Sequence, residues 1–229
     1  MITELINKIR RKMAFYFRLT RPYISIAINK QGESILDVGC GKGESIKVVD
    51  RNRRLIRVGA DIFEPHLKEC QMQGTYDELV LCNVLMLPFQ IKSFDIVVCL
   101  DVIEHMEKEE GRRFITYLEK IARKQVIIDA PVGICKQKPL EGNPYYEHKS
   151  TWTAIDFKNL GYTVRGFGVY GLYGEQGLRF RLPRVIAIPF CSFVFVLSSP
   201  FTFFFPSIAG DMVCTKKLRP DLEKTRPKK

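Results

Sequence analysis

Residues 35–45 read Ile35-Leu36-Asp37-Val38-Gly39-Cys40-Gly41-Lys42-Gly43-Glu44-Ser45, and this stretch decides the fold. The apolar positions before Gly39 predict a buried strand, and the alternating glycines predict a sharp turn whose backbone can pass close to a ligand. A helix is expected to begin directly after the turn. A glycine turn between a first parallel strand and a helix is typical of a cofactor site. The dinucleotide fingerprint G-x-G-x-x-G does not fit, because Glu44 occupies the position of its third glycine.

Strands and helices alternate after this turn, which predicts a doubly wound sheet. Apolar runs bounded by polar or glycine residues predict strands at about 34–39, 55–61, 78–83, 94–100, 125–130, 162–168 and 211–218. Helices are expected at about 44–52, 64–72, 103–123 and 151–160. We therefore expect an α/β fold with a Rossmann-like sheet of seven strands, mostly parallel with the last strand antiparallel, and helices on both faces.

Three parts of the chain are expected from its composition. Residues 1–30 contain a basic amphipathic helix, with apolar side chains at helical spacing over 2–18. Residues 31–218 form the main domain, and residues 219–229 form a disordered basic tail. An apolar insertion at about 170–210 precedes the last strand.

This insertion carries no charged residue from Val185 to Gly210. Pro189, Pro200 and Pro206 are expected to break any single membrane span. The sequence therefore favours an element that lies on a membrane surface over one that crosses the bilayer.

The glycine spacing resembles motif I of the class I S-adenosylmethionine-dependent methyltransferases, in which an acid stands two residues before the first glycine. The resemblance covers about residues 33–165 and the last strand, and it implies S-adenosylmethionine as cofactor. Asp61 follows Gly39 by 22 residues, close to the offset of about 20 expected of a ribose-binding acid. A turn residue or a helix N-cap is the alternative for Asp61. The cofactor contacts that the resemblance implies are Asp37, Gly39, Cys40, Gly41, Gly43, Asp61, Ile62, Asn83, Val84, Leu100 and Asp101.

Two later stretches also follow the pattern of that family. Asn83 precedes Leu87-Pro88-Phe89, at a position where the family often has an acid that meets the adenine amino group. The side-chain oxygen of Asn83 can still accept that hydrogen bond, and a turn-forming asparagine is the alternative. Residues 94–106 resemble the family's fourth motif, including the pair Glu104-His105.

The residues after the fourth strand have both catalytic and structural interpretations. Asp101-x-x-Glu104 also resembles a capping box, so Glu104 has a structural alternative. His105 is expected to border the pocket as a base or orienting group, with a structural histidine as the alternative. Asp101 and His105 could hold a metal ion, but no third ligand is evident from the spacing, so no metal site is predicted.

The acceptor side of the site is expected in residues 144–148. This segment resembles the Pro-Tyr-x-x-His substrate loop of many small-molecule and lipid methyltransferases. The resemblance makes Tyr145 and Tyr146 substrate contacts and His148 a second catalytic candidate. A loop packed by its own aromatic side chains is the alternative.

Composition bears on partners and location. The net charge of +11 suits an anionic membrane, a nucleic acid or an acidic substrate, with simple solvated surface as the alternative. The seven scattered cysteines predict reduced thiols in the cytoplasm. The apolar insertion and its basic flanks predict peripheral attachment to the inner face of a membrane.

These observations predict an S-adenosylmethionine-dependent methyltransferase acting on a small-molecule, lipid or glycan-precursor acceptor. One alternative is a non-catalytic binding protein with the same fold, against which the intact glycine turn and Asp61 argue. The other is an RNA methyltransferase, suggested only by the charge. Nucleic acid is disfavoured because no RNA-binding module is recognisable. The sequence gives no indication of oligomeric state.

Overall fold

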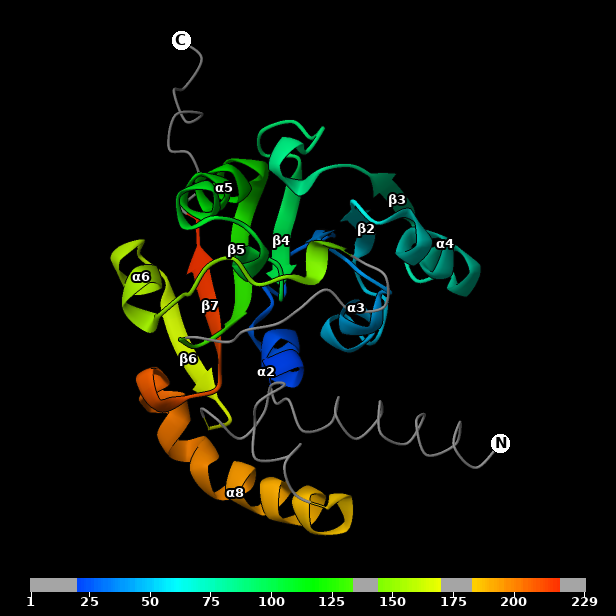
Figure 1. The fold of residues 1–229 in the computed structure, drawn as a ribbon. Coiled ribbons are helices and arrows are strands. Elements are labelled where there is room, and N and C mark those ends of the chain that lie inside the picture. The colour runs from blue at the N-terminus through cyan, green and yellow to red at the C-terminus, as the bar shows by residue number, and fades with distance from the viewer. Residues whose placement is uncertain (1–19, 134–143, 170–182, 219–229) are drawn as a thin grey trace.

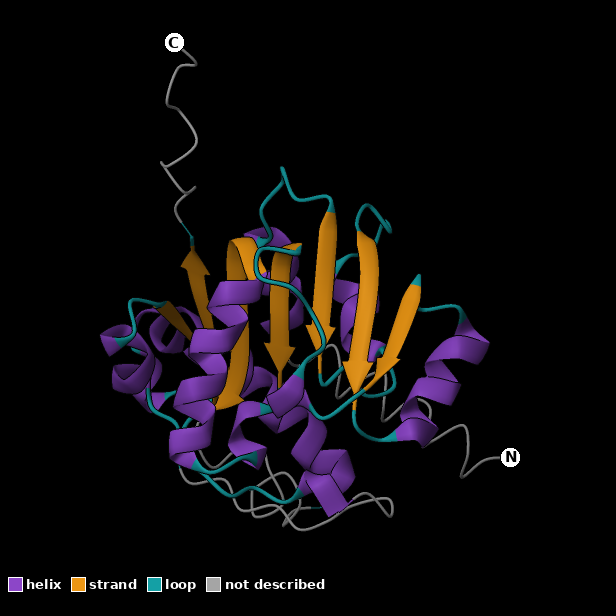
Figure 2. Cartoon of the chain, turned by 90° about the horizontal axis from the view of Figure 1, so that it is seen from above, coloured by secondary structure: helices purple, strands orange, loops and turns teal. Residues whose placement is uncertain are grey.

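A computed structural model describes residues 20–133, 144–169 and 183–218 of the chain (Figure 1). Its framework is a sheet of seven strands in the order β3-β2-β1-β4-β5-β7-β6. The strands are β1 (Ser34–Val38), β2 (Ile56–Asp61), β3 (Glu78–Leu81), β4 (Phe94–Leu100), β5 (Ala122–Pro131), β6 (Thr163–Phe167) and β7 (Asp211–Lys217). Strands β1 to β5 pair in parallel, and β7 runs antiparallel to both β5 and β6 (Figure 2). The predicted fold class, including the antiparallel last strand, is confirmed.

Helices cover both faces of the sheet, as predicted. They are α2 (Thr20–Ala27), α3 (Glu44–Val49), α4 (Glu64–Gln73), α5 (Lys108–Ile121), α6 (Ala154–Asn159) and α8 (Arg184–Phe204), with short 3-10 turns η1 (Val84–Met86), η2 (Ile103–His105), η3 (Pro144–Tyr146) and η4 (Pro206–Ile208). Successive residues of a strand point to opposite faces, so Leu36 joins the apolar cluster under α5 and α6, whereas Ile35 joins the one under α2, α3 and α4. The sheet lies between these two layers of helices, and the carboxyl ends of its parallel strands lie together at one edge.

The helix predicted over 103–123 is divided into two pieces. The turn η2 ends at Met106, whose extended backbone interrupts the helix, and α5 begins only at residue 108. The capping box of α5 is formed by Glu107 and Glu110, not by Asp101 and Glu104 as the spacing suggested. Glu104 is therefore not a cap of α5, and its side chain is buried.

The apolar insertion forms one continuous helix over its described part. Helix α8 runs through Pro189 and Pro200, which were expected to interrupt it. An interior proline removes a single backbone hydrogen bond, and the helix bends along its length (Figure 1). One side of α8 is buried, with Ala187, Cys191 and Phe195. The C-terminal end of the helix packs on β6, where the rings of Phe203 and Phe167 meet with centroids 5.8 Å apart.

Some predicted features cannot be compared with the structure. The amphipathic helix over 2–18, the tail after 218 and the first part of the insertion lie outside the described residues. Within the described ranges, none of the helices combines the length and apolar character needed to cross a membrane.

Candidate active site

A cavity of about 300 Å³ opens at the carboxyl edge of the sheet, where the strand order reverses between β1 and β4. Ten of the predicted site residues line it: Gly39, Gly41, Asp61, Ile62, Asn83, Val84, Asp101, His105, Tyr145 and Tyr146. They come from the ends of four parallel strands and from the loop around η3. The fold thus brings the expected cofactor contacts and the expected acceptor contacts to one cavity.

The glycine turn after β1 forms the first wall. The backbone N–H groups of Gly39 and Cys40 both donate to the carbonyl oxygen of Ala60, which pins the turn to β2. At Gly39, with a φ of +71°, an added Cβ would lie 2.3 Å from Val102 Cγ2. At Gly41, with a φ of +51°, an added Cβ would meet no atom of the described residues within 4 Å. Packing therefore requires the first glycine, whereas the second leaves space on the cavity wall for a ligand.

Asp61, at the end of β2, has a structural role as well as a position on the cavity. Its Oδ2 accepts a 2.8 Å hydrogen bond from the N–H of Gly41, and its Oδ1 accepts one of 2.8 Å from the N–H of Phe63. The turn role that the sequence left open is therefore real. A carboxylate offers about four acceptor positions, so further positions are left for ligand hydroxyls.

Asn83 both forms a turn and lies on the cavity, so the structural and the ligand-binding interpretations apply together. Its Oδ1 accepts a 3.0 Å hydrogen bond from the N–H of Leu85 and so caps η1. The residue nevertheless lines the cavity. An amide oxygen accepts two hydrogen bonds, so one position is left for a ligand donor.

Five predicted site residues do not line the cavity: Asp37, Cys40, Gly43, Leu100 and His148. Asp37 is buried behind the glycine turn, where its Oδ2 accepts a 2.7 Å hydrogen bond from the hydroxyl of Tyr76. The contact with Cys70, together with burial, raises the pKa of the Cys40 thiol, so this cysteine is protonated and unreactive. Asp37 and Cys40 therefore lie behind the wall of the cavity.

Asp101 follows β4 with an unusual backbone. Its φ is +57°, in the left-handed region that few residues other than glycine adopt. Its N–H donates a 3.0 Å hydrogen bond to the carbonyl oxygen of Asp129 on β5. Such a conformation is concentrated at functional sites, and here it lies on the cavity between the two expected halves of the site.

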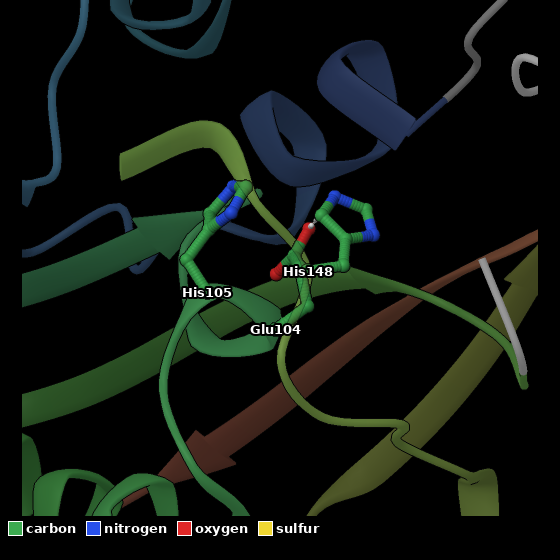
Figure 3. A group of neighbouring side chains, drawn as sticks. All are labelled: Glu104, His105 and His148. Atoms are coloured by element: carbon green, nitrogen blue, oxygen red, sulfur yellow. Dashed lines mark ion pairs between the residues drawn. The ribbon is translucent and has the colours of Figure 1, made fainter. Parts of the chain in front are cut away.

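The loop after residue 143 is bonded directly to η2. The carbonyl oxygen of Glu104 accepts hydrogen bonds from the N–H groups of Lys149 and Ser150, at 2.8 and 3.0 Å. The rings of His105 and His148 meet edge to face, with centroids 4.8 Å apart. His148 Nε2 lies 4.0 Å from Glu104 Oε1 (Figure 3). Residues more than forty positions apart in sequence therefore form one side of the site.

Burial changes the protonation of this group. Desolvation lowers the pKa of His105, so the imidazole is neutral at physiological pH. Desolvation, with the charge of Asp101 as the next cause, raises the pKa of Glu104 well above its usual value. A neutral imidazole at the cavity wall can accept a proton or donate a lone pair to a metal ion.

Sequence reasoning missed six residues of the cavity wall: His66, Leu85, Val102, Met106, Glu110 and Lys149. His66 lies in the first turn of α4, five residues after Asp61, and packs edge to face on Phe63 with centroids 4.8 Å apart. Because His66 follows Asp61 so closely in sequence, its place on the cavity wall could have been predicted. Glu110 and Met106 carried none, because their placement depends on the break before α5.

Comparison with known proteins agrees with this geometry. Residues 36–128 match the family model described as a methyltransferase domain. The chain is 32% identical over 94 residues to the probable tRNA methyltransferase 9B of Mus musculus, covering 41% of this chain and 20% of that protein. It is 31% identical over 126 residues to the tRNA (carboxymethyluridine(34)-5-O)-methyltransferase alkbh8 of Xenopus tropicalis, covering 52% of this chain and 19% of that protein. The chain thus spans about a fifth of the length of these curated relatives.

Solved structures share the fold over most of the chain. A SAM-dependent methyltransferase from Archaeoglobus fulgidus aligns with a TM-score of 0.55 and 17% identity, covering 87% of this chain and 95% of that one. The magnesium protoporphyrin IX methyltransferase of Synechocystis PCC 6803, solved with bound SAM, aligns with a TM-score of 0.52 and 16% identity, covering 87% and 76%. The comparisons thus identify residues 36–128 as similar to a methyltransferase domain and show that the chain as a whole has the fold of solved S-adenosylmethionine-dependent methyltransferases.

Proposed function

We propose that the protein transfers a methyl group from S-adenosylmethionine to an acceptor that binds beside His105 and Tyr146. The observation that carries this proposal is the single cavity that joins the glycine turn and Asp61 to the histidine and tyrosine side chains. S-adenosylmethionine supplies a methyl group on a positively charged sulfonium, which is already a good leaving group.

The residues of the chain fit this cofactor. The open space at Gly41 admits a ligand close to the backbone, and Asp61 has acceptor positions left for a ribose diol. Asp61 and Asp101 line the cavity and provide negative charge for the cationic sulfonium. The main task of the protein is then to align the acceptor with the methyl group, and neutral His105 is placed to accept a proton if the acceptor carries one.

The acceptor that we favour is a small molecule or a lipid-linked molecule. The outer face of α8 supports this choice. Side chains at helical spacing along it are 46 to 66% exposed, and all are apolar: Ile186, Phe190, Phe193, Leu197, Phe201 and Phe204. On α5 the corresponding exposed face carries Glu109, Arg113, Thr116 and Lys120. An apolar stripe of this length is unusual on a free surface.

Such a stripe, in a chain with a net charge of +11, fits the surface of an anionic membrane, because apolar insertion and charge attraction add. We therefore place the protein at the cytoplasmic face of a membrane as part of the proposal. Flotation with anionic vesicles tests this, with neutral vesicles as the first control. The double variant Phe193→Ser/Phe201→Ser should float less than the wild type, and the matched variant Glu109→Ser/Arg113→Ser on α5 should not differ from it. Failure of the wild type to float with anionic vesicles would rule the membrane proposal out.

RNA is the second candidate acceptor. Of the two relatives named above, one is a probable tRNA methyltransferase and the other a tRNA methyltransferase, and the chain is strongly basic. Incubating the protein with radiolabelled S-adenosylmethionine and a cell extract distinguishes the candidates, because lipid and RNA fractions can be separated by solvent extraction. Label in the lipid or small-molecule fraction supports our first proposal, whereas label confined to RNA contradicts it.

Cofactor binding is tested independently of the acceptor. Titration calorimetry with S-adenosylmethionine and with S-adenosylhomocysteine should show one site for each on the full chain. If neither binds, the proposal of methyl transfer is wrong, and the alternative of a non-catalytic protein with this fold gains support.

A further inference from the structure

We propose that Glu104, His105 and His148 bind a divalent transition-metal ion beside the cofactor cavity. The role of this ion in turnover rests on the proposed methyl transfer. At helical spacing, only Asp101 and His105 stand as possible ligands in the sequence. The fold supplies further ligands, because the loop carrying His148 is bonded to the backbone of Glu104.

The three side chains converge on one point (Figure 3). One ligand atom from each lies within 4.8 Å of the others. Around zinc, ligand atoms at about 2.0–2.2 Å from the metal lie about 3.4 Å from one another in tetrahedral geometry. Binding therefore requires the ligand atoms to approach one another by up to about 1.4 Å, which rotations of the imidazole and carboxylate groups can provide.

Glu104 is the member that most needs a cation. Its side chain is 2% exposed, and its Oε2 has no hydrogen-bond partner among the described residues. Leaving a buried carboxyl oxygen without a partner is unfavourable. A metal ion would give this oxygen a partner.

His105 is oriented as metal-binding histidines are. Its Nδ1 lies 3.0 Å from the carbonyl oxygen of Glu147. Since a carbonyl oxygen can only accept, Nδ1 carries the proton and Nε2 keeps its lone pair. A hydrogen bond from the other ring nitrogen to a backbone carbonyl is the usual support of a histidine ligand.

The ligand types select the class of metal. Two imidazole nitrogens and one carboxylate suit zinc, manganese, iron or cobalt better than magnesium or calcium, which prefer all-oxygen sites. Three protein ligands leave at least one coordination position for water or for an acceptor. His105 lines the cavity, so such a position is accessible from the acceptor side.

The ion would activate an acceptor oxygen. Coordination of an acceptor hydroxyl lowers its pKa. The hydroxyl proton leaves to solvent, because the lone pair of His105 then binds the ion and this histidine no longer acts as the base. The resulting oxyanion attacks the methyl carbon, so the new O–C bond forms as the S–C bond breaks. The sulfonium charge is neutralised, and the products are the methylated acceptor and S-adenosylhomocysteine.

The test measures metal binding without turnover. Manganese(II) is the probe, because it disfavours the thiolates of the seven cysteines, and the loss of its free electron paramagnetic resonance signal reports bound ion. The full-length wild type should bind one ion per chain, and added zinc should displace it. Glu104→Gln and His148→Ala should each weaken binding by at least tenfold. The matched control is Glu109→Gln, since Glu109 is an exposed carboxylate on α5 that lies outside both the cluster and the cavity wall, and it should bind manganese as the wild type does.

Calorimetry with S-adenosylhomocysteine on the same variants shows that they are folded. A wild type that binds neither manganese nor zinc overturns the metal inference, as does binding that is unchanged in two folded cluster variants. Cofactor binding without metal binding would leave the proposed function standing and refute the metal site. Metal binding without cofactor binding would refute the proposed function and leave the metal site standing.

Discussion

The two edges of the sheet hold their carboxylates in different ways. At the amino ends of the strands, acids are paired with cationic side chains of the same chain. The pairs are Asp50 with Arg57 at 3.0 Å, Asp77 with Arg53 at 2.7 Å, and Asp95 with Arg123 at 2.8 Å and Lys124 at 3.3 Å. At the carboxyl ends, two of the acids accept hydrogen bonds from neutral donors. Asp61 accepts from two backbone N–H groups, and Asp37 accepts from the hydroxyl of Tyr76.

This difference shows where the molecule keeps charge for a ligand. Pairing at the amino edge cancels the negative charge within the protein, whereas neutral donors at the carboxyl edge leave it in place. Asp61 and Asp101, which line the cavity, supply this charge. In a chain of net charge +11, an acidic cavity is suited to cations such as a sulfonium or a divalent metal ion.

The largest effect is expected from the glycine turn that holds the carboxyl edge in place. Gly39→Ala should lower the free energy of unfolding by at least about 3 kcal/mol, because it combines a left-handed backbone with overlap against Val102. Gly41→Ala should cost only about 1 kcal/mol, since no atom opposes its Cβ. It should nevertheless weaken cofactor binding. Denaturant unfolding and calorimetry measure the two effects, and equal destabilisation by both variants would contradict the distinction.

The second prediction compares variants at the two edges of the sheet by their affinity for the cofactor. Asp61→Ala should weaken S-adenosylmethionine binding about 100-fold or more, because it removes charge-assisted hydrogen bonds worth about 1.5–3 kcal/mol each. Asp95→Asn, at the opposite edge, should bind the cofactor like the wild type. Calorimetry on both variants gives the comparison. If Asp61→Ala binds normally, the carboxyl edge does not hold the ribose.

The cofactor half of the site could be predicted because its residues lie close in sequence to strand ends. Gly39 and Gly41 follow β1, and Asp61 ends β2, so strand assignment alone places them at one edge. Asp37 shows the limit of this reasoning. The same motif predicts it as a cofactor contact, but in the structure it points to Tyr76 behind the turn.

The acceptor half could be predicted only in part. Tyr145 and Tyr146 were expected there, and they do line the cavity. The side-chain position of Glu104 was not predictable, because its spacing from Asp101 equally suits a capping box, and only the extended Met106 moves the helix start to residue 108. The pairing of Glu104 with His148 depends on the path of a loop more than forty residues later. Local periodicity carries no signal for such contacts.

The third effect concerns turnover. His105→Ala and His148→Ala should each reduce the rate of methyl transfer about 10- to 100-fold, the range for residues that hold or orient a metal or a proton. Cofactor affinity should change by no more than about threefold, since Asp61 and the glycine turn are untouched. Rates can be compared once an acceptor is known, with Glu109→Gln on the exposed face of α5 as the control. Full rates in both variants would mean that alignment alone carries the chemistry.

The smallest effect tests the amino edge through the pH dependence of stability. Burial alone raises the pKa of Asp95, but the N–H of Glu33 and the cationic groups of Arg123 and Lys124 outweigh it and hold this pKa below its usual value. A carboxyl whose pKa is lower in the folded state stabilises the fold above its unfolded value of about 3.9, and this contribution is lost as the pH falls through the folded value. Asp95→Asn should therefore lower the free energy of unfolding by about 1 kcal/mol at pH 7. Its difference from the wild type should shrink as the pH is lowered below about 3.9 in urea unfolding experiments. A difference that persists in acid would mean that packing, not ion pairing, is what Asp95 contributes. A loss of cofactor affinity in this variant would show that the two edges are not independent.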